Sequence, residues 1–162
     1  MKRERVWVIA AVVVVIAAVT WIVWPSSDAE PRSRQYKETA ACLLTDDKGL
    51  NDAGAAAVWA GMQKASEQTL VRVQYLTVTG AQTTANAETF LGTFTQSKCA
   101  VILAIGTAPT QAVPQVAPRF PNIRFVTVGG GAAGANVSAV TGDAAAFQQG
   151  GHDAVVAAAA QS

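Results

Sequence analysis

The chain opens with one long hydrophobic segment. Residues 6–24, VWVIAAVVVVIAAVTWIVW, are 19 residues without a charged side chain, nearly enough at about 1.5 Å per residue to cross a hydrocarbon core of about 30 Å. Basic residues lie at positions 2, 3 and 5, and the next one follows only at position 32. The positive-inside rule therefore predicts a cytoplasmic tail at 1–5, a transmembrane helix at 6–24 and an exported remainder.

A cleavable signal peptide is the alternative interpretation of this segment. Ser27-Asp28-Ala29 offers small residues at the two positions that a signal peptidase recognises. The apolar core of a cleavable signal is usually only about 7 to 15 residues long, so the pattern favours a retained anchor. The polar residues 25–38, with prolines at 25 and 31, are expected to be a linker.

Beyond residue 38 the pattern alternates short β-type runs with longer alanine-rich stretches. The expected strands are residues 40–45, 71–78, 99–105, 123–128 and 137–141. The expected helices are residues 52–68, 84–96, 107–119 and 143–161, of which the third contains three prolines and should be short, kinked or partly irregular. Strands that alternate with helices indicate consecutive βαβ units and a parallel sheet.

The fold class expected for residues 39–162 is therefore α/β. Right-handed crossovers are expected to produce a three-layer α/β/α sandwich with a five-stranded parallel sheet in the flavodoxin-like order 2-1-3-4-5. The run at 99–105 is apolar throughout and suits a central strand, whereas 71–78 alternates and suits an edge. Ligands of such sheets bind at the switch point between strands one and three, so the loops 46–51 and 106–110 are the expected site.

The amino-acid composition argues against several classes of function. A net charge of +1 with 14% charged residues offers no basic surface for nucleic acid. His152 is the only histidine, which leaves little for a metal site or a catalytic triad. Gly129, Gly131 and Gly134 have the spacing of a dinucleotide fingerprint, but a further strand follows where a helix is required, so a tight turn is expected. We expect no enzyme activity, no cofactor and no metal.

Two cysteines, Cys42 and Cys99, lie on strands that the expected order makes neighbours. An exported domain with an even number of cysteines predicts a disulfide between them. Cys42 lies four residues before the end of its strand region at Asp46 and Cys99 seven before Gly106, so the bond requires the strand ends to be staggered. Two buried thiols are the alternative.

Three segments resemble the BMP family of ABC transporter substrate-binding proteins, the basic membrane lipoproteins related to purine-nucleoside receptors. They are LLTDDKGLNDAGAAAVWAGMQKAS (43–66), AVILAIGTAPTQAVPQVAPRFPNIRFVTVGGG (100–131) and ANVSAVTGDAAAFQQGG (135–151). The resemblance implies one lobe, the first, of a type I periplasmic-binding-protein fold. It also implies capture of a nucleoside or similar small molecule for an ABC importer.

The resemblance also assigns site residues. Asp47, Lys48 and Asn51 match the family's Asp-Lys and Asn, Gly49 replaces a serine, and Leu50 replaces the aromatic residue that stacks on a base. Asp46 and Thr107 lie in the two loops at the expected switch point, so the expected ligand-binding residues are Asp46, Asp47, Asn51 and Thr107. The alternative is a solvated turn at the strand end, with Asp52 capping the next helix.

Together these features predict a membrane-anchored, extracellular substrate-binding domain with a cytoplasmic N-terminus. Its expected partners are a nucleoside-like small molecule, the membrane through residues 6–24, and an ABC transporter permease or a second copy of the chain. The alternative function is a ligand-free interaction or sensing module derived from one lobe of a binding protein.

Overall fold

The computed structural model describes residues 35–161. The predicted cytoplasmic tail and transmembrane helix, and most of the predicted linker, lie outside these residues. Within residues 35–161 no helix combines the length and apolar character needed to cross a membrane.

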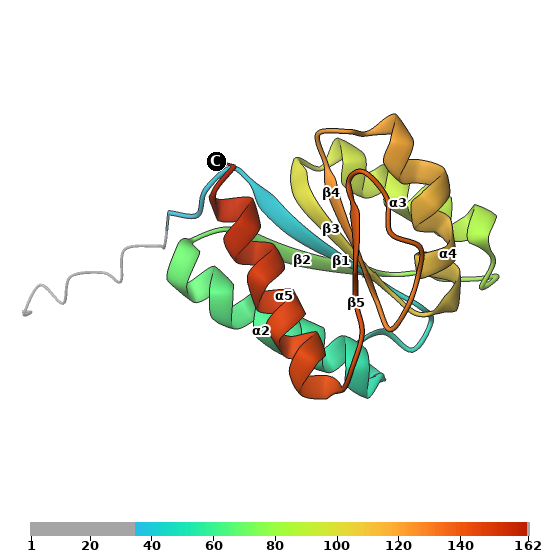
Figure 1. Ribbon diagram of the computed structural model, residues 1–162, viewed down its shortest axis with the longest axis horizontal. Coiled ribbons are helices and arrows are strands. Elements are labelled where there is room, and N and C mark those ends of the chain that lie inside the picture. The colour runs from blue at the N-terminus through green and yellow to red at the C-terminus, as the bar shows by residue number, and fades with distance from the viewer. Residues whose placement is uncertain (1–34, 162) are drawn as a thin grey trace, which may run out of the picture. The chain divides into compact units, whose positions relative to one another are not determined.

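Five parallel strands form the centre of the domain (Figure 1). They are β1 (Ala40–Thr45), β2 (Arg72–Thr77), β3 (Cys99–Ile105), β4 (Arg124–Val128) and β5 (Val137–Val140). Their order, β2-β1-β3-β4-β5, confirms the predicted topology. The central strand β3 is almost entirely buried and β2 forms an edge, as the apolar and alternating patterns predicted.

Helices cover both faces of the sheet, as Figure 1 shows. The helices α2 (Ala53–Thr69) and α5 (Ala144–Ala159) cover one face, and α3 (Thr84–Gln96) and α4 (Thr107–Val116) cover the other. Two short 3-10 helices, η1 (Gly49–Asn51) and η2 (Ala117–Arg119), complete the element order. The region 107–119, predicted as one short, kinked or partly irregular helix, is thus divided into α4 and η2. Pro114 is accommodated inside α4, and the chain changes to 3-10 geometry at η2, which contains Pro118.

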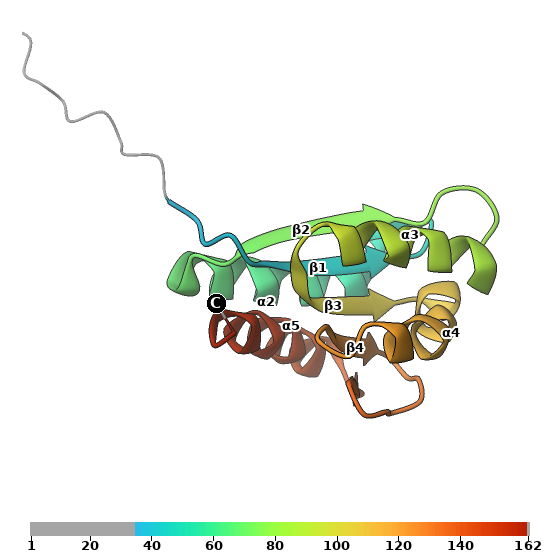
Figure 2. The ribbon, with the colours of Figure 1, turned by 90° about the horizontal axis from the view of Figure 1, so that it is seen from above.

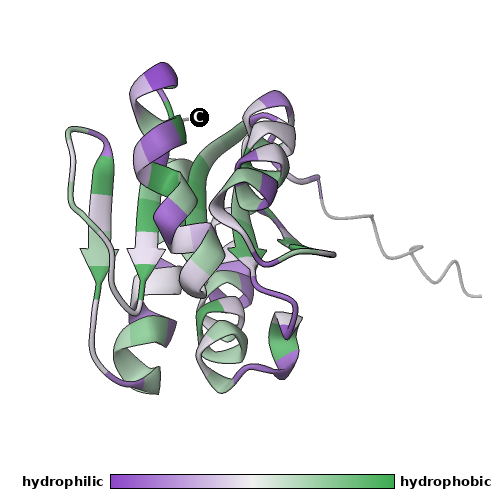
Figure 3. Cartoon of the chain, turned by 90° about the vertical axis from the view of Figure 1, so that its right-hand side faces the viewer, coloured by the Kyte–Doolittle hydropathy of each residue, from purple (hydrophilic) through white to green (hydrophobic). Residues whose placement is uncertain are grey.

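Alternating side chains of β1 and β3 build two separate apolar layers. Cys42, Leu44 and Ile102 point toward α3 and α4. Leu43, Val101 and Leu103 point toward α2 and α5. Figure 3 shows the result: the strands are largely hydrophobic, and hydrophilic residues gather on the outer sides of the helices and in the loops.

The contact between α2 and α5 depends on two glycines. A methyl group on Gly61 would collide with the backbone carbonyl of Gln148, and one on Gly151 would collide with the carbonyl of Val58. Both glycines are buried. The two helix backbones therefore lie so close together that neither position has room for a side chain.

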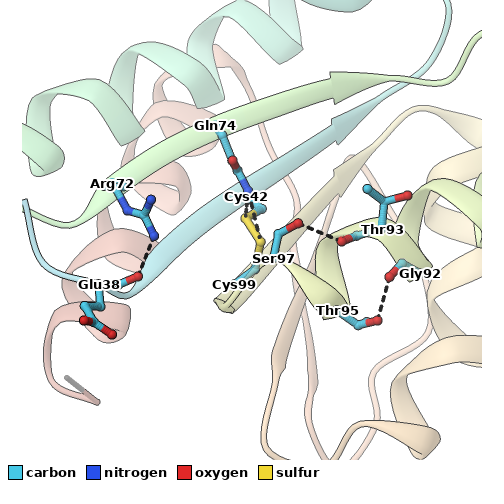
Figure 4. Close-up of a disulfide and its surroundings, with 9 residues drawn as sticks. All are labelled: Glu38, Cys42, Arg72, Gln74, Gly92, Thr93, Thr95, Ser97 and Cys99. Atoms are coloured by element: carbon cyan, nitrogen blue, oxygen red, sulfur yellow. Dashed lines mark hydrogen bonds between the residues drawn. A yellow bond between two sulfur atoms is a disulfide. The ribbon is translucent and has the colours of Figure 1, made fainter.

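Cys42 and Cys99 lie at bonding distance, as predicted, and join β1 to β3 (Figure 4). The pairing register shifts between Ala40, opposite Cys99, and Ala41, opposite Val101. This irregularity lets the two Cα atoms approach to 5.9 Å, within the range that a disulfide needs. The side-chain amide of Gln74 on β2 lies 3.2 Å from the Cys42 sulfur and 3.5 Å from the Cys99 sulfur.

Candidate functional site

A hollow of about 750 Å³ opens beyond the carboxyl ends of β1, β3 and β4. This is the switch point of the sheet, because the chain runs from β1 outward to β2 and then returns to β3 on the other side. The residues that line it come from the last positions of β3 and β4, from the loops after these three strands, and from α2, α4 and α5. They are Asp46, Asp52, Gly54, Ala55, Ile105, Gly106, Thr107, Thr110, Gln111, Pro114, Val128, Gly129, Gly130, Gly131, Ala132 and Phe147.

Asp46 contributes a half-buried carboxylate directly after β1. One of its oxygens accepts the backbone N–H of Lys48 at 3.1 Å, which orients the side chain. Gly106, at the end of β3, has a φ of +99°, and a methyl group there would lie 2.9 Å from the Asp46 Cβ. Only glycine can adopt this φ and also leave room for the Asp46 side chain. The close approach of the end of β3 to Asp46 therefore requires glycine at position 106.

Asp52 forms a second acidic wall at the start of α2. Its carboxylate accepts the backbone N–H groups of Gly54 at 2.9 Å and Ala55 at 3.0 Å. This is the N-cap arrangement that the sequence suggested as the structural role of Asp52. Asp52 also lines the hollow. The same carboxylate therefore caps α2 and contributes negative charge to the hollow.

The third wall is the start of α4, which begins at Thr107 directly after β3. The Thr110 hydroxyl is bonded back to the Gly106 carbonyl at 2.7 Å. Gln111, the next residue, accepts a hydrogen bond from the Thr84 hydroxyl at 3.3 Å and so connects α4 to α3. This side of the hollow therefore presents hydroxyl and amide groups.

A glycine turn after β4 closes the fourth side. Gly129, Gly130 and Gly131 have φ values of +84°, +141° and +125°, a region that favours glycine. The turn leads into β5 and not into a helix. The dinucleotide fingerprint is therefore excluded in favour of the predicted turn, and bare backbone borders the hollow here.

Phe147 is a residue of the hollow that sequence reasoning missed. Its ring lies beside the turn and the start of α2: a methyl group built on Gly54 would lie 3.3 Å from the ring, and one on Gly129 would lie 3.9 Å from it. The sequence signal was an aromatic residue in the first turn of the helix after the fifth strand. By contrast Leu50, where the resemblance expects an aromatic ring, is half-buried and packs against the apolar layer under α2 and α5.

The structure separates the four predicted ligand-binding residues into two pairs. Asp46 and Thr107 line the hollow together, whereas Asp47 and Asn51 are exposed and are not among its lining residues. The reason is the turn at residues 47–48 followed by η1, which carries the chain away from the ends of the strands. The Asp47 N–H accordingly pairs with the Gln82 side chain at 3.3 Å, on the loop before α3.

The charge of the hollow is negative. The residues that line it include the carboxylates of Asp46 and Asp52 and contain no lysine, arginine or histidine. A phosphate or carboxylate placed there would meet like charge without a cation to offset it. The lining instead suits hydroxyl and amine groups, which can donate to the two carboxylates.

A sequence comparison identifies residues 40–161 as a match to the Bmp family model, described as ABC transporter substrate-binding protein PnrA-like. That match covers nearly all of the domain and about three quarters of the chain. None of the curated proteins compared with the chain matches it.

Solved structures share the fold at low sequence identity. A fragment from Peptoclostridium difficile 630 described as a lipoprotein aligns with a TM-score of 0.61 and 12% identity, over 76% of this chain and 99% of its own. A solute-binding protein of an ABC transporter system from Aeropyrum pernix K1 aligns at 0.52 and 21%, over 63% of this chain and 28% of its own. A transcriptional activator of the comK gene from Bacillus halodurans aligns at 0.51 and 18%, over 62% and 33%. The chain thus spans nearly all of the first fragment and about a third of the other two proteins.

Proposed function

Because the chain belongs to the Bmp family of PnrA-like ABC transporter substrate-binding proteins, we propose that its domain binds an uncharged, nucleoside-like small molecule in the hollow. The ligand would then pass to the permease of an ABC transporter. The observation that supports this role is the hollow of about 750 Å³ at the switch point of the sheet. Its volume falls within the range of about 300 to 1,000 Å³ that is usual for small-molecule sites.

The chemistry of the walls supports a hydroxylated ligand with a flat apolar part. The Asp46 carboxylate and the Thr107 hydroxyl can take up ligand hydroxyl groups. The Phe147 ring beside the glycine turn offers an apolar surface to a base. Asp47 and Asn51, on the neighbouring exposed loop, are proposed as outer contacts that meet a ligand larger than the hollow. A polar, concave site of this kind favours ligand binding over a ligand-free interaction module.

The proposal places the domain outside the cell, held by residues 6–24 as a single transmembrane helix with residues 1–5 in the cytoplasm. Its support is the uncharged 19-residue segment after three basic residues. A disulfide between Cys42 and Cys99 is consistent with an oxidising compartment.

Calorimetry with adenosine tests the assignment of the polar contacts. Asp46→Asn keeps an acceptor oxygen but removes the charge, so a neutral hydrogen bond replaces a charge-assisted one and binding is expected to weaken by about 1 to 1.5 kcal/mol, or roughly 5- to 13-fold. The matched substitution Asp47→Asn, on the next residue but outside the hollow, is expected to change the affinity by less than about threefold. An equal loss in both variants would move the site to the exposed loop, and no heat with any of the three proteins at millimolar adenosine would refute nucleoside binding.

A further inference from the structure

The outer edge of the sheet is a second surface, apart from the hollow, at which the domain could bind a partner. Figure 2 shows β2 as the outermost strand, and among the described strands it pairs only with β1. An open edge offers unpaired backbone N–H and C=O groups to a further strand. Residues 73–77 of β2, VQYLT, contain no charge, proline or glycine, so the usual devices that protect an edge are lacking over these residues.

The pairing register determines which backbone groups point outward. Arg72 donates its N–H to the Thr39 carbonyl, and Val78 donates to the Thr45 carbonyl. Because successive residues of a strand point their backbone groups in opposite directions, the even-numbered residues of β2 bond to β1. Val73, Tyr75 and Thr77 therefore direct their backbone N–H and C=O groups away from the sheet.

Two exposed large hydrophobic residues lie along this edge, beside the exposed polar side chains of Arg72 and Gln74. Tyr75 is 43% exposed and lies at the middle of the outward set. Its ring makes an edge-on contact with Trp59 of α2, with ring centroids 5.2 Å apart, so it is held in place above the edge. Leu70, just before β2, is 38% exposed and adopts a φ of +59°, a conformation that costs free energy for a branched side chain.

We propose that β2 pairs in antiparallel fashion with β2 of a second copy of this chain, about a two-fold axis at Tyr75. In that register Tyr75 faces the partner's Tyr75 and Val73 faces the partner's Thr77. Each of these pairs joins outward-pointing residues, so every outward N–H and C=O of residues 73–77 gains a partner. The result is one continuous ten-stranded sheet with a self-complementary interface, the usual form of a two-fold dimer.

One further feature fits a second copy as the occupant. A two-fold axis at Tyr75 brings two Trp59–Tyr75 pairs side by side on one face of the sheet. Arg72, at the start of β2, donates to the Glu38 carbonyl of its own chain at 2.7 Å (Figure 4), so its charge is directed toward the residues before β1 and not toward the partner's edge. The residues lining the hollow include none from β2, so dimerisation and ligand binding can fail independently.

Cysteine cross-linking of the full-length chain in its membrane tests the register. In an antiparallel hydrogen-bonded pair the Cα atoms lie about 5.5 Å apart, so Tyr75→Cys should form a disulfide-linked dimer under mild oxidation. Thr77→Cys is the matched control, since its two copies would lie more than about 13 Å apart in this register. Equal cross-linking of both variants, no cross-linking of Tyr75→Cys, or an adduct of any mass other than a dimer would overturn the proposal.

Sedimentation of the full-length chain in detergent provides a second readout that does not depend on cysteine. Tyr75→Lys places two ammonium groups at the axis and is expected to raise the dimer dissociation constant at least tenfold. Val156→Lys, at an equally exposed apolar position on α5 (42% exposed), should leave it unchanged. A monomeric wild-type chain at all concentrations, or equal effects of the two lysines, would exclude the dimer.

Discussion

Replacing Cys42 and Cys99 together by alanine is expected to lower the free energy of unfolding of the domain by about 2 to 5 kcal/mol. The two residues are separated by 57 positions in the sequence, so the bond closes a long loop and restricts the unfolded chain. Both side chains are buried, and the alanines would also leave unfilled volume between the sheet and α3. Guanidinium unfolding of residues 35–162, wild type against the double variant, measures the difference.

Reductant supplies the internal control for this experiment. Wild-type protein unfolded and refolded in dithiothreitol should lose most of the same stability, whereas the double variant should not respond to reductant. If the wild type and the double variant unfold at the same guanidinium concentration without reductant, the two sulfurs are not bonded in the protein.

The substitution Gly61→Ala is expected to destabilise the domain by about 3 kcal/mol or more, the upper end of the overpacking range. The added methyl group collides with the carbonyl of Gln148 on α5. That obstacle is backbone, so it cannot rotate away as a side chain would, and relief requires the two helices to move apart. Thermal or denaturant unfolding followed by circular dichroism measures the loss.

Gly92 provides a control of the same chemistry in another helix. It lies inside α3, and a methyl group built there meets no atom within 4 Å. Gly92→Ala is therefore expected to stabilise the domain by about 0.5 to 1 kcal/mol, because alanine loses less conformational freedom in a helix. Two glycine-to-alanine changes of opposite sign would establish the close approach of α2 and α5, and stabilisation by both would contradict it.

Much of the fold was predictable because the signals were periodic and local. The apolar run of β3 and the alternation of β2 indicated a central and an edge strand, and right-handed crossovers left few possible orders. The bounds of α3 agree with the predicted helix at 84–96, and its start is fixed by the Thr83 side chain, which caps the first turn. The division of the third helical region at Val116 was less certain from sequence, since a proline in a helix can either end it or be accommodated.

The site was less predictable because it depends on distances across the fold. Strand ends indicated the edge of the sheet at which the hollow lies, and they placed Asp46 and Thr107 there. The direction taken by η1, which leaves Asp47 and Asn51 outside the hollow, follows from tertiary packing of Leu50 under α2. Phe147 lies about 100 residues further along the chain, and no local pattern connects it to Gly54, which it meets.

Amide chemical-shift mapping of residues 35–162 titrated with adenosine, beside adenosine 5′-monophosphate, is the most direct test of ligand binding in the hollow. Adenosine is predicted to shift the amides of Asp46, Thr107 and the turn Gly129–Gly131, together with Phe147, in a saturable manner. The monophosphate is predicted to cause no such shifts, because Asp46 and Asp52 repel it and no cation in the hollow offsets them. Shifts confined to other surfaces, or a stronger response to the monophosphate, would contradict binding of an uncharged nucleoside at this site.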